Sequence, residues 1–327
     1  KLILRDRAAW ICTLVLAAAF SVPIAFNSPI YGPFFMKQGM QGFVDAFNTR
    51  APQASGTDLS PEQQADAELA RYANAALAAQ TDAAFLDSAE SYYALMGEGF
   101  QSGSIVGDQE TNDAALAYCR ALSSSGITDI PASASDLPFL SFLPYAIATA
   151  PSFLPFIPFL LSSILLLGAT RPGTLAAKAP APKFRRLIQI VFSIIAAGTA
   201  MLLAGLAPGG IYALVLNGFG QIGYPIAFFH DGALATTTAG NVFTTLLLAL
   251  LAGGTLISVC SAVLSTATRR VLAGPLTSAL LVAAPAFPLL SDSALGHNAV
   301  LGLLPLAVFS PIEATGYVGC FPTEFIG

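Results

Sequence analysis

The residues of this sequence that could carry acid–base chemistry are few. One of its two histidines, His230, is followed directly by Asp231. A carboxylate beside an imidazole can hold the ring for proton transfer near neutral pH, but the pair is more typical of a polar turn at a membrane interface. A membrane-embedded transferase would need carboxylates gathered at one membrane face, whereas Asp6, Asp231 and Asp292 are scattered along the chain. We therefore predict no catalytic residues and no enzymatic activity.

Motifs for nucleotides and metals are also absent from the sequence. The glycine-rich stretches 205–210 and 218–223 lack the GxxxxGK[ST] pattern of a phosphate-binding loop and do not lie between a predicted strand and a helix. The cysteines form no Cys-x-x-Cys pair, so a metal or redox framework is not expected. They lie in two apolar runs, in an acidic region and near the end of the sequence: Cys12, Cys260, Cys119 and Cys320. We predict no metal, no cofactor and no nucleic-acid partner.

Most basic residues fall in three clusters that flank long uncharged runs. These clusters are Lys1, Arg5 and Arg7; then Arg171, Lys178, Lys183, Arg185 and Arg186; then Arg269 and Arg270. Lys and Arg close to the ends of membrane spans stay on the cytoplasmic side, where they can also anchor the chain to anionic lipid. All three clusters are therefore expected inside.

The runs between these clusters have the composition of membrane spans. Of 327 residues, 55% are hydrophobic and 10% are charged, against about a quarter charged in a typical soluble domain. Runs without Asp, Glu, Lys or Arg cover 8–36, 137–170, 187–230, 232–268, 271–291 and 293–312. About 20 apolar residues cross the hydrocarbon as a helix, and these runs lack the alternation of barrel strands. The sequence predicts an all-α, polytopic membrane protein and excludes a water-soluble globule.

The clusters fix the order of the crossings. Residues 1–27 hold a cytoplasmic beginning and the first span, residues 28–138 form an extracytoplasmic domain, and residues 139–327 hold the other spans and a cytoplasmic loop at 171–186. The expected spans lie near 8–26, 146–168, 187–207, 241–266 and 271–290, with a shorter, proline-broken sixth at 299–312. Prolines at 138, 144, 151, 155 and 158 are expected to break the entry to the second span. The count is therefore five to six.

Residues 209–229 cannot be a full crossing in this arrangement, because Arg269 and Arg270 would then lie outside. The segment is rich in glycine and contains Pro225. Broken backbone at membrane depth must be covered by protein or line a cavity. We expect an outer re-entrant or interfacial segment.

The predicted external region is acidic and mainly helical. Between residues 28 and 136 it has fourteen acids and four bases. Ser60 and Pro61 begin a predicted helix that runs to about residue 84, and further helices are expected at 82–96 and 112–122. Helical spacing places four residues on one face, which we expect to pack in a core: Phe85, Ala89, Tyr92 and Tyr93. The region is then a modest helical cap.

The tract 241–311 supplies a more specific pattern. The small-residue-rich span TTLLLALLAGGTLISVCSAVLS is followed by the basic turn TATRR, the proline-broken span LLVAAPAFPLL and the stretch LLPLAVFSP. Together with the external domain after the first span, this layout resembles the membrane-spanning subunits of ATP-binding-cassette exporters of the second exporter class. The segment FGQIGYPIAFF is similar to an outer segment of such proteins. In that family a final span follows, and since few residues follow Pro311 and the sequence begins at Lys1, we expect a fragment.

The resemblance implies a permease subunit in the cell membrane that pairs with a second permease subunit and is powered by a separate ATPase inside. The surface it implies for coupling to that ATPase comprises Arg5, Arg7, Arg171, Lys178, Lys183, Arg185 and Arg186. The implied substrate is lipid-like, peptidic or drug-like. Since the spans hold almost no ionisable residues, an ion-driven carrier is disfavoured. The alternative is a non-transport assembly or sensory protein whose acidic external domain binds a partner.

Overall fold

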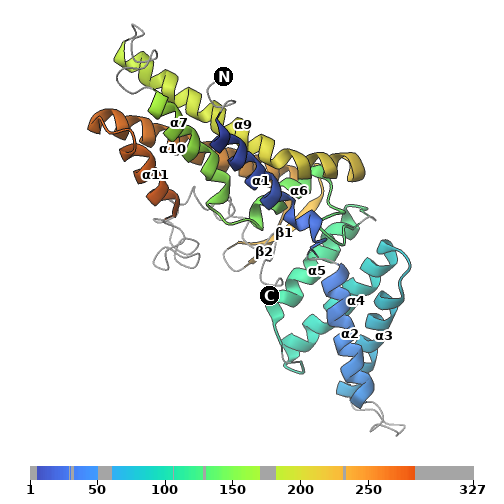
Figure 1. The fold of residues 1–327 in the computed structure, drawn as a ribbon. Coiled ribbons are helices and arrows are strands. Elements are labelled where there is room, and N and C mark those ends of the chain that lie inside the picture. Colours follow the sequence, from blue (N-terminus) through green and yellow to red (C-terminus); the bar gives the residue numbers. More distant parts are fainter. Residues whose placement is uncertain are drawn as a thin grey trace. The chain divides into compact units, whose positions relative to one another are not determined.

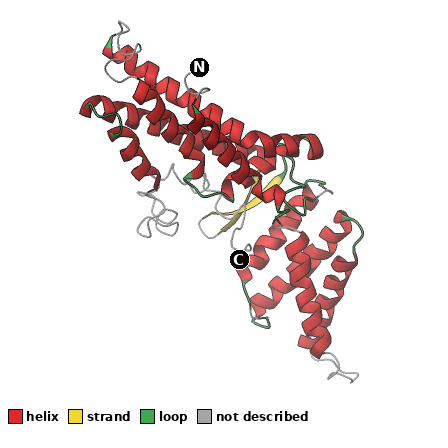
Figure 2. Ribbon diagram, viewed as in Figure 1, coloured by secondary structure: helices red, strands yellow, loops and turns green. Residues whose placement is uncertain are grey.

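The computed structural model describes residues 6–28, 30, 33–50, 61–105, 107–127, 130–169, 182–230 and 233–283. Within these ranges the chain is helical apart from one two-stranded hairpin (Figure 2). It divides into two compact units (Figure 1). Unit 1 contains the described parts of Lys1–Phe26, Pro138–Phe219 and Val242–Val318, and unit 2 contains those of Asn27–Leu137 and Gly220–Asn241.

Three helices of the described chain are long and apolar enough to cross a membrane. They are α1 (Arg7–Ala25), residues Phe184–Asn217 of α9 (Lys183–Asn217), and α10 (Ala239–Thr268). Shorter apolar helices are α6 (Phe139–Ala148), the 3-10 turn η3 (Leu154–Phe156) joined to α7 (Ile157–Ala169), and α11 (Ala273–Ala283). The chain is therefore a helical membrane protein, and the expected sixth span lies outside the described residues.

The second apolar run, which includes the expected span at 146–168, is not one continuous helix. The chain leaves helical geometry after Ala148 and resumes it at Leu154, and α7 then begins at Ile157. Pro151, Pro155 and Pro158 cause this break, because proline lacks an N–H group and disfavours helical backbone at the residue before it.

Helix α9 is longer than the sequence predicted. It continues through Pro208 and ends at Asn217, ten residues beyond the expected end, where Gly218 takes a φ of 76°. The following residues form an antiparallel hairpin of β1 (Pro225–His230) and β2 (Ala233–Thr238), with Ile226 opposite Thr237. The segment 209–229 is thus divided between a helix, a turn and a strand, and the purely all-α expectation missed the hairpin.

Glycines let the helices of unit 1 approach closely. A methyl group on Gly205 of α9 would lie 2.6 Å from Cβ of Leu16 in α1, and one on Gly209 would lie 2.7 Å from the ring of Phe142 in α6. Phe159 of α7 is wedged between α9 and α10, since a methyl group on Gly198 or Gly254 would lie within 2.6 Å of its ring. Small residues commonly drive helix association in lipid in this way.

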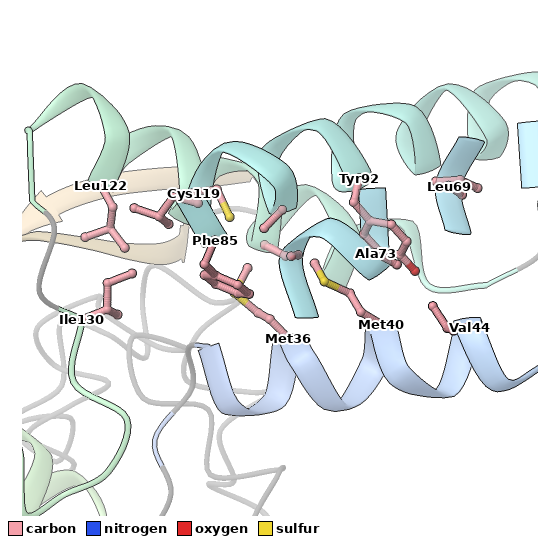
Figure 3. Close-up of a cluster of buried hydrophobic side chains, with 14 of the residues drawn as sticks. Met36, Met40, Val44, Leu69, Ala73, Phe85, Tyr92, Cys119, Leu122 and Ile130 are labelled. Carbon is pink, nitrogen blue, oxygen red and sulfur yellow. The ribbon is translucent and has the colours of Figure 1, made fainter. Parts of the chain in front are cut away.

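Unit 2 is built around four helices: α2 (Pro33–Arg50), α3 (Pro61–Ala78), α4 (Asp82–Ser102) and α5 (Gln109–Ser124). Figure 3 shows their shared core, in which Met36 and Met40 of α2 meet Phe85 and Tyr92 of α4. Phe85, Ala89 and Tyr92 are buried and Tyr93 is partly buried, which confirms the predicted packed face. Helix α2 was not predicted, and the hairpin strand β1 packs on α5.

Candidate functional site

The described members of the predicted coupling surface lie at the beginnings of two helices. Arg7 is the first residue of α1, where Asp6 caps the helix by accepting a hydrogen bond of 2.8 Å from the N–H of Ala8. Lys183, Arg185 and Arg186 occupy the first turn of α9. Arg7 and Arg185 are exposed, and Arg186 is half-buried. The remaining members of the surface lie outside the described residues: Arg5, Arg171 and Lys178.

The bases of α9 oppose the helix dipole. The first turn of a helix carries partial positive charge, which favours acids there and disfavours bases by about 0.3–1 kcal/mol each. The first turn of α9 holds no acid and three bases. These residues therefore weaken the helix locally, and their placement calls for a reason outside the helix, such as membrane orientation or an anionic partner.

Contacts along unit 1 fix the relative direction of its helices. Leu16 lies against Gly205 and Phe20 against Gly209, so residue numbers rise together along α1 and α9 and the two helices are parallel. Helix α10 runs the opposite way to α9. Gly198 and Gly254 share Phe159, while Phe139 contacts Gly210 and lies 6.4 Å, between ring centroids, from Phe243.

This arrangement places the described basic residues toward one end of unit 1. Because α9 and α10 are antiparallel, Arg185 at the start of α9 and Arg269 after α10 lie within about one helical turn along the axis. Arg7 lies about 16 Å farther along, since both α1–α9 contacts join residues whose numbers differ by 189. The described bases of the second and third clusters therefore share one end of unit 1, whereas Arg7 of the first cluster lies nearer the middle of α9.

Serine hydroxyl groups join α10 to α11 in the interior of unit 1. Ser261 of α10 and Ser278 of α11 are buried and hydrogen-bonded at 2.9 Å. The hydroxyl of Ser265 donates to the carbonyl oxygen of Val271 at 3.0 Å and accepts from the N–H of Gly274 at 3.2 Å. The charged residues of the described part of unit 1 all lie at or just beyond helix ends.

The described part of unit 2 has a shallow groove of about 600 Å³ along the outer face of α5. Asp113 and Arg120 line it together with Pro225 of the hairpin. Arg120 donates from Nε to Oε1 of Glu90 at 3.1 Å, and both side chains are partly exposed. The groove combines a carboxylate, a guanidinium and an alanine-rich floor, which suits weak recognition of a polar partner.

The other groups that the sequence drew attention to show no constellation for catalysis. His230 is the last residue of β1, and Asp231 lies outside the described residues. Cys12, Cys119 and Cys260 are free thiols, and burial raises the pKa of Cys119 to about 12. The described chain also contains no group of three or more His, Cys, Asp or Glu side chains that could hold a metal.

The sequence did not predict how far α1 and α9 are offset along their axes. The signal that could have revealed this offset is the charge-free run 187–230, which is about twice the length of one crossing. No protein-family model, curated protein or solved structure matches this chain, so its geometry and sequence carry the functional argument.

Proposed function

We propose that this chain is a permease subunit of an ATP-powered exporter of the second exporter class. One observation supports this most: the bases at the start of α9 and in the α10–α11 turn lie at one end of a membrane unit whose described helix interiors carry no charge. The basic end can bind a partner at one membrane surface. The described helices lack the ionisable groups at the membrane midplane that line the transport path of ion-driven carriers. The energy then comes from a separate ATPase.

In this proposal the basic end of unit 1 is cytoplasmic and unit 2 is extracytoplasmic. Helix α1 has 19 residues and is about 28 Å long, close to the ~30 Å of a bilayer's hydrocarbon. Asp6 and Arg7 then lie at the inner surface. A bilayer centred on residues 187–207 would instead carry both charges about 13 Å into the hydrocarbon, where each costs roughly 2.5–3.5 kcal/mol near the centre.

The substrate class follows from the lining of unit 1. Among the described residues of unit 1, the buried polar groups are hydroxyls of serines, Tyr145 and Thr199, and the other buried side chains are apolar. Such surfaces accommodate lipid-like, peptidic or drug-like molecules better than ions, which need fixed opposite charges. A second permease subunit would complete the path, and two arrangements of the helices would alternate with ATP binding and hydrolysis.

The alternative function is an assembly or sensory protein that binds a partner through unit 2. The groove beside Asp113 and Arg120 favours it, because it offers both signs of charge on an exposed helical face. This function requires no ATPase. The two proposals therefore differ in what should accompany the chain in the membrane.

Affinity purification of the tagged chain from its native membrane tests the proposal. We expect an ATPase with a phosphate-binding loop to co-purify with it. Replacing Lys183, Arg185 and Arg186 together with Glu should reduce the recovered ATPase, because the inner surface loses three bases and gains three acids. Labelling from outside must show that this variant inserts normally, since the same bases set the orientation. Recovery without any ATPase would contradict the proposal.

A further inference from the structure

The chain between α6 and α7 bulges sideways within unit 1. Phe142 of α6 lies against Gly209 of α9, and Phe159 of α7 lies against Gly198 of the same helix. These two glycines are about 16 Å apart along α9, whereas a continuous helix from Phe142 to Phe159 would rise about 26 Å. The non-helical residues 149–153 between the end of α6 and the start of η3, which we call the bulge, take up this difference.

The bulge lies at the height of the middle of α1. Counting along the helices from Phe142 to Ala148, and from Phe159 back to Leu154, places both ends of the bulge level with residue 203 of α9. The contacts between α1 and α9 join residues whose numbers differ by 189, so this level corresponds to Leu14. The inference rests on the proposed function, in which α1 spans the bilayer. The bulge then lies near the midplane of the membrane.

The bulge and the end of α6 offer backbone groups that the described chain leaves without hydrogen bonds. Because proline has no N–H, Pro151 cannot donate to the carbonyl oxygen of Ile147, as a continuing helix would require. Among the described residues, no donor reaches this carbonyl or that of Ala148, and no acceptor reaches the N–H groups of Ser152 and Phe153. Pro151 is exposed and Phe153 is 44% exposed, so the described residues do not cover the bulge.

These groups need a partner other than lipid. Lipid tails form no hydrogen bonds, so non-helical backbone at membrane depth is buried in protein or lines a water-filled cavity. Transporters commonly bind their substrates near the midplane, where such discontinuous helices supply backbone groups. About one helical turn along the axis from the bulge, the hydroxyl oxygen of Thr199 in α9 is buried and has no hydrogen-bond partner in the described structure.

We propose that the bulge lines the transport path and binds an amide group of a neutral, peptidic substrate. An amide has one N–H and one carbonyl, which complement the carbonyls of Ile147 and Ala148 and the N–H groups of Ser152 and Phe153. A lipid ester only accepts hydrogen bonds and would leave both carbonyls unpaired. An ion is disfavoured, because the described helix interiors of unit 1 carry no charge.

Cysteine reactivity tests whether the bulge lines a cavity. Phe153→Cys is placed in the full-length chain with its natural cysteines replaced, and a membrane-impermeant maleimide is added to the protein in nanodiscs. Leu14→Cys is the matched control, since Leu14 lies at the same height in α1 and is 66% exposed. Maleimide reacts with the thiolate, which forms in water and not among lipid tails, so we expect Phe153→Cys to react at least about tenfold faster. Equal, slow reaction at both positions would overturn the cavity and the binding site with it.

Protection by a peptide tests the binding. N-acetyl-trileucine amide should slow the labelling of Phe153→Cys at least about fivefold, and its analogue with every amide nitrogen methylated should not, because that analogue has no N–H to donate. A monoacylglycerol is the lipid probe. Protection by the lipid probe and not by the peptide would overturn the assignment of an amide. Protection by none of the three probes would overturn the binding site and leave only the cavity.

A proline variant tests the unpaired carbonyl. Pro151→Ala supplies an N–H that can bond to the carbonyl of Ile147, so protection by the peptide should fall at least about fivefold. Pro144→Ala, within α6, is the control and should leave protection unchanged. Unchanged protection in Pro151→Ala would contradict the role of this carbonyl.

The site and the proposed function can fail separately. If an ATPase co-purifies with the chain and is stimulated by it, but the peptide does not protect Phe153→Cys, the site is wrong and the proposed function stands. If the peptide protects Phe153→Cys but no ATPase accompanies the chain, the site stands and the exporter function fails.

Discussion

The packing of Phe159 between two glycines makes a quantitative prediction about unit 1. In Gly198→Ala the new methyl group would lie 2.5 Å from Cδ1 and 3.0 Å from Cα of Phe159. The ring could turn away from the first contact, but the second involves the backbone of α7. Helix α7 must therefore move away from α9, or the contact between the methyl group and Cα of Phe159 must remain too short.

The size of the effect follows from two opposing contributions. Overpacking of a filled interface typically costs about 1–3 kcal/mol. Replacing glycine by alanine inside a helix returns about 0.8–1.0 kcal/mol through backbone entropy. The net change for Gly198→Ala is a loss of up to about 2 kcal/mol. Gly168→Ala in α7 is the matched control, because nothing lies within 4 Å of its added methyl group and only the gain applies.

Equilibrium unfolding by SDS in mixed micelles measures the difference between these two variants. We expect Gly198→Ala to be less stable than Gly168→Ala by about 1–3 kcal/mol, which is the overpacking cost alone. Phe159→Leu should recover part of the loss in the Gly198→Ala background, because the smaller side chain leaves room for the methyl group. Equal stability of Gly198→Ala and Gly168→Ala would refute the close packing of α7 on α9.

Three further predictions concern topology, the α10–α11 hairpin and alkaline stability. Cysteines at Glu62 and Asp108 should react with an impermeant thiol reagent added outside intact cells, and cysteines at Thr174 and Thr268 should not. Labelling at Thr174 from outside would show that the orientation is the opposite of the expected one. A double-mutant cycle of Ser261→Ala and Ser278→Ala should give a coupling energy of about 0.6 kcal/mol and at most about 1.7 kcal/mol, and a value of zero would mean that the bond of these two hydroxyls is not formed. Burial raises the pKa of the Cys119 thiol from its ordinary value of 9.0 to about 12, so this thiol loses its proton at lower pH in the unfolded chain than in the folded one. The contribution of Cys119 to the stability of unit 2 should then be constant below about pH 9 and fall between about pH 9 and 12 by up to ~1.4 kcal/mol per pH unit, and Cys119→Ala should make this part of the curve less steep.

The helices of unit 2 were partly predictable because residues at their N-termini indicate where the helices begin. Pro61 begins α3 as expected, and α4 begins at Asp82 after Thr81, whose hydroxyl accepts from the N–H of Ala84 at 3.3 Å. Helix α2 also begins at a proline, Pro33, but it was not predicted, since Gly39 and Gly42 lower its helical propensity. It forms because Met36, Met40 and Val44 enter the core, which is a tertiary effect.

In unit 1 the sequence predicted the interruptions of helices better than the offsets between helices along their axes. The prolines between residues 151 and 158 predicted an interruption, but not that the helix would stop on both sides of it. The end of α9 at Gly218 and the hairpin lie inside one charge-free run, where composition offers no boundary. The offset between α1 and α9 depends on which side chain of one helix packs against which glycine of the other. Packing between helices determines these pairs, and residue spacing within one helix does not.

The central claim is that a separate ATPase powers this chain, and ATP hydrolysis in proteoliposomes tests it most directly. The co-purified ATPase is reconstituted with and without the chain, and its hydrolysis rate is compared; liposomes with the chain alone are given an imposed proton or sodium gradient. We predict that the chain alone neither hydrolyses ATP nor takes up fluorescent lipid or peptide probes along the gradient, and that the ATPase rate rises severalfold when the chain is present. Gradient-driven uptake by the chain alone, with an unchanged ATPase rate, would contradict the account and favour a carrier built on the broken backbone after α9.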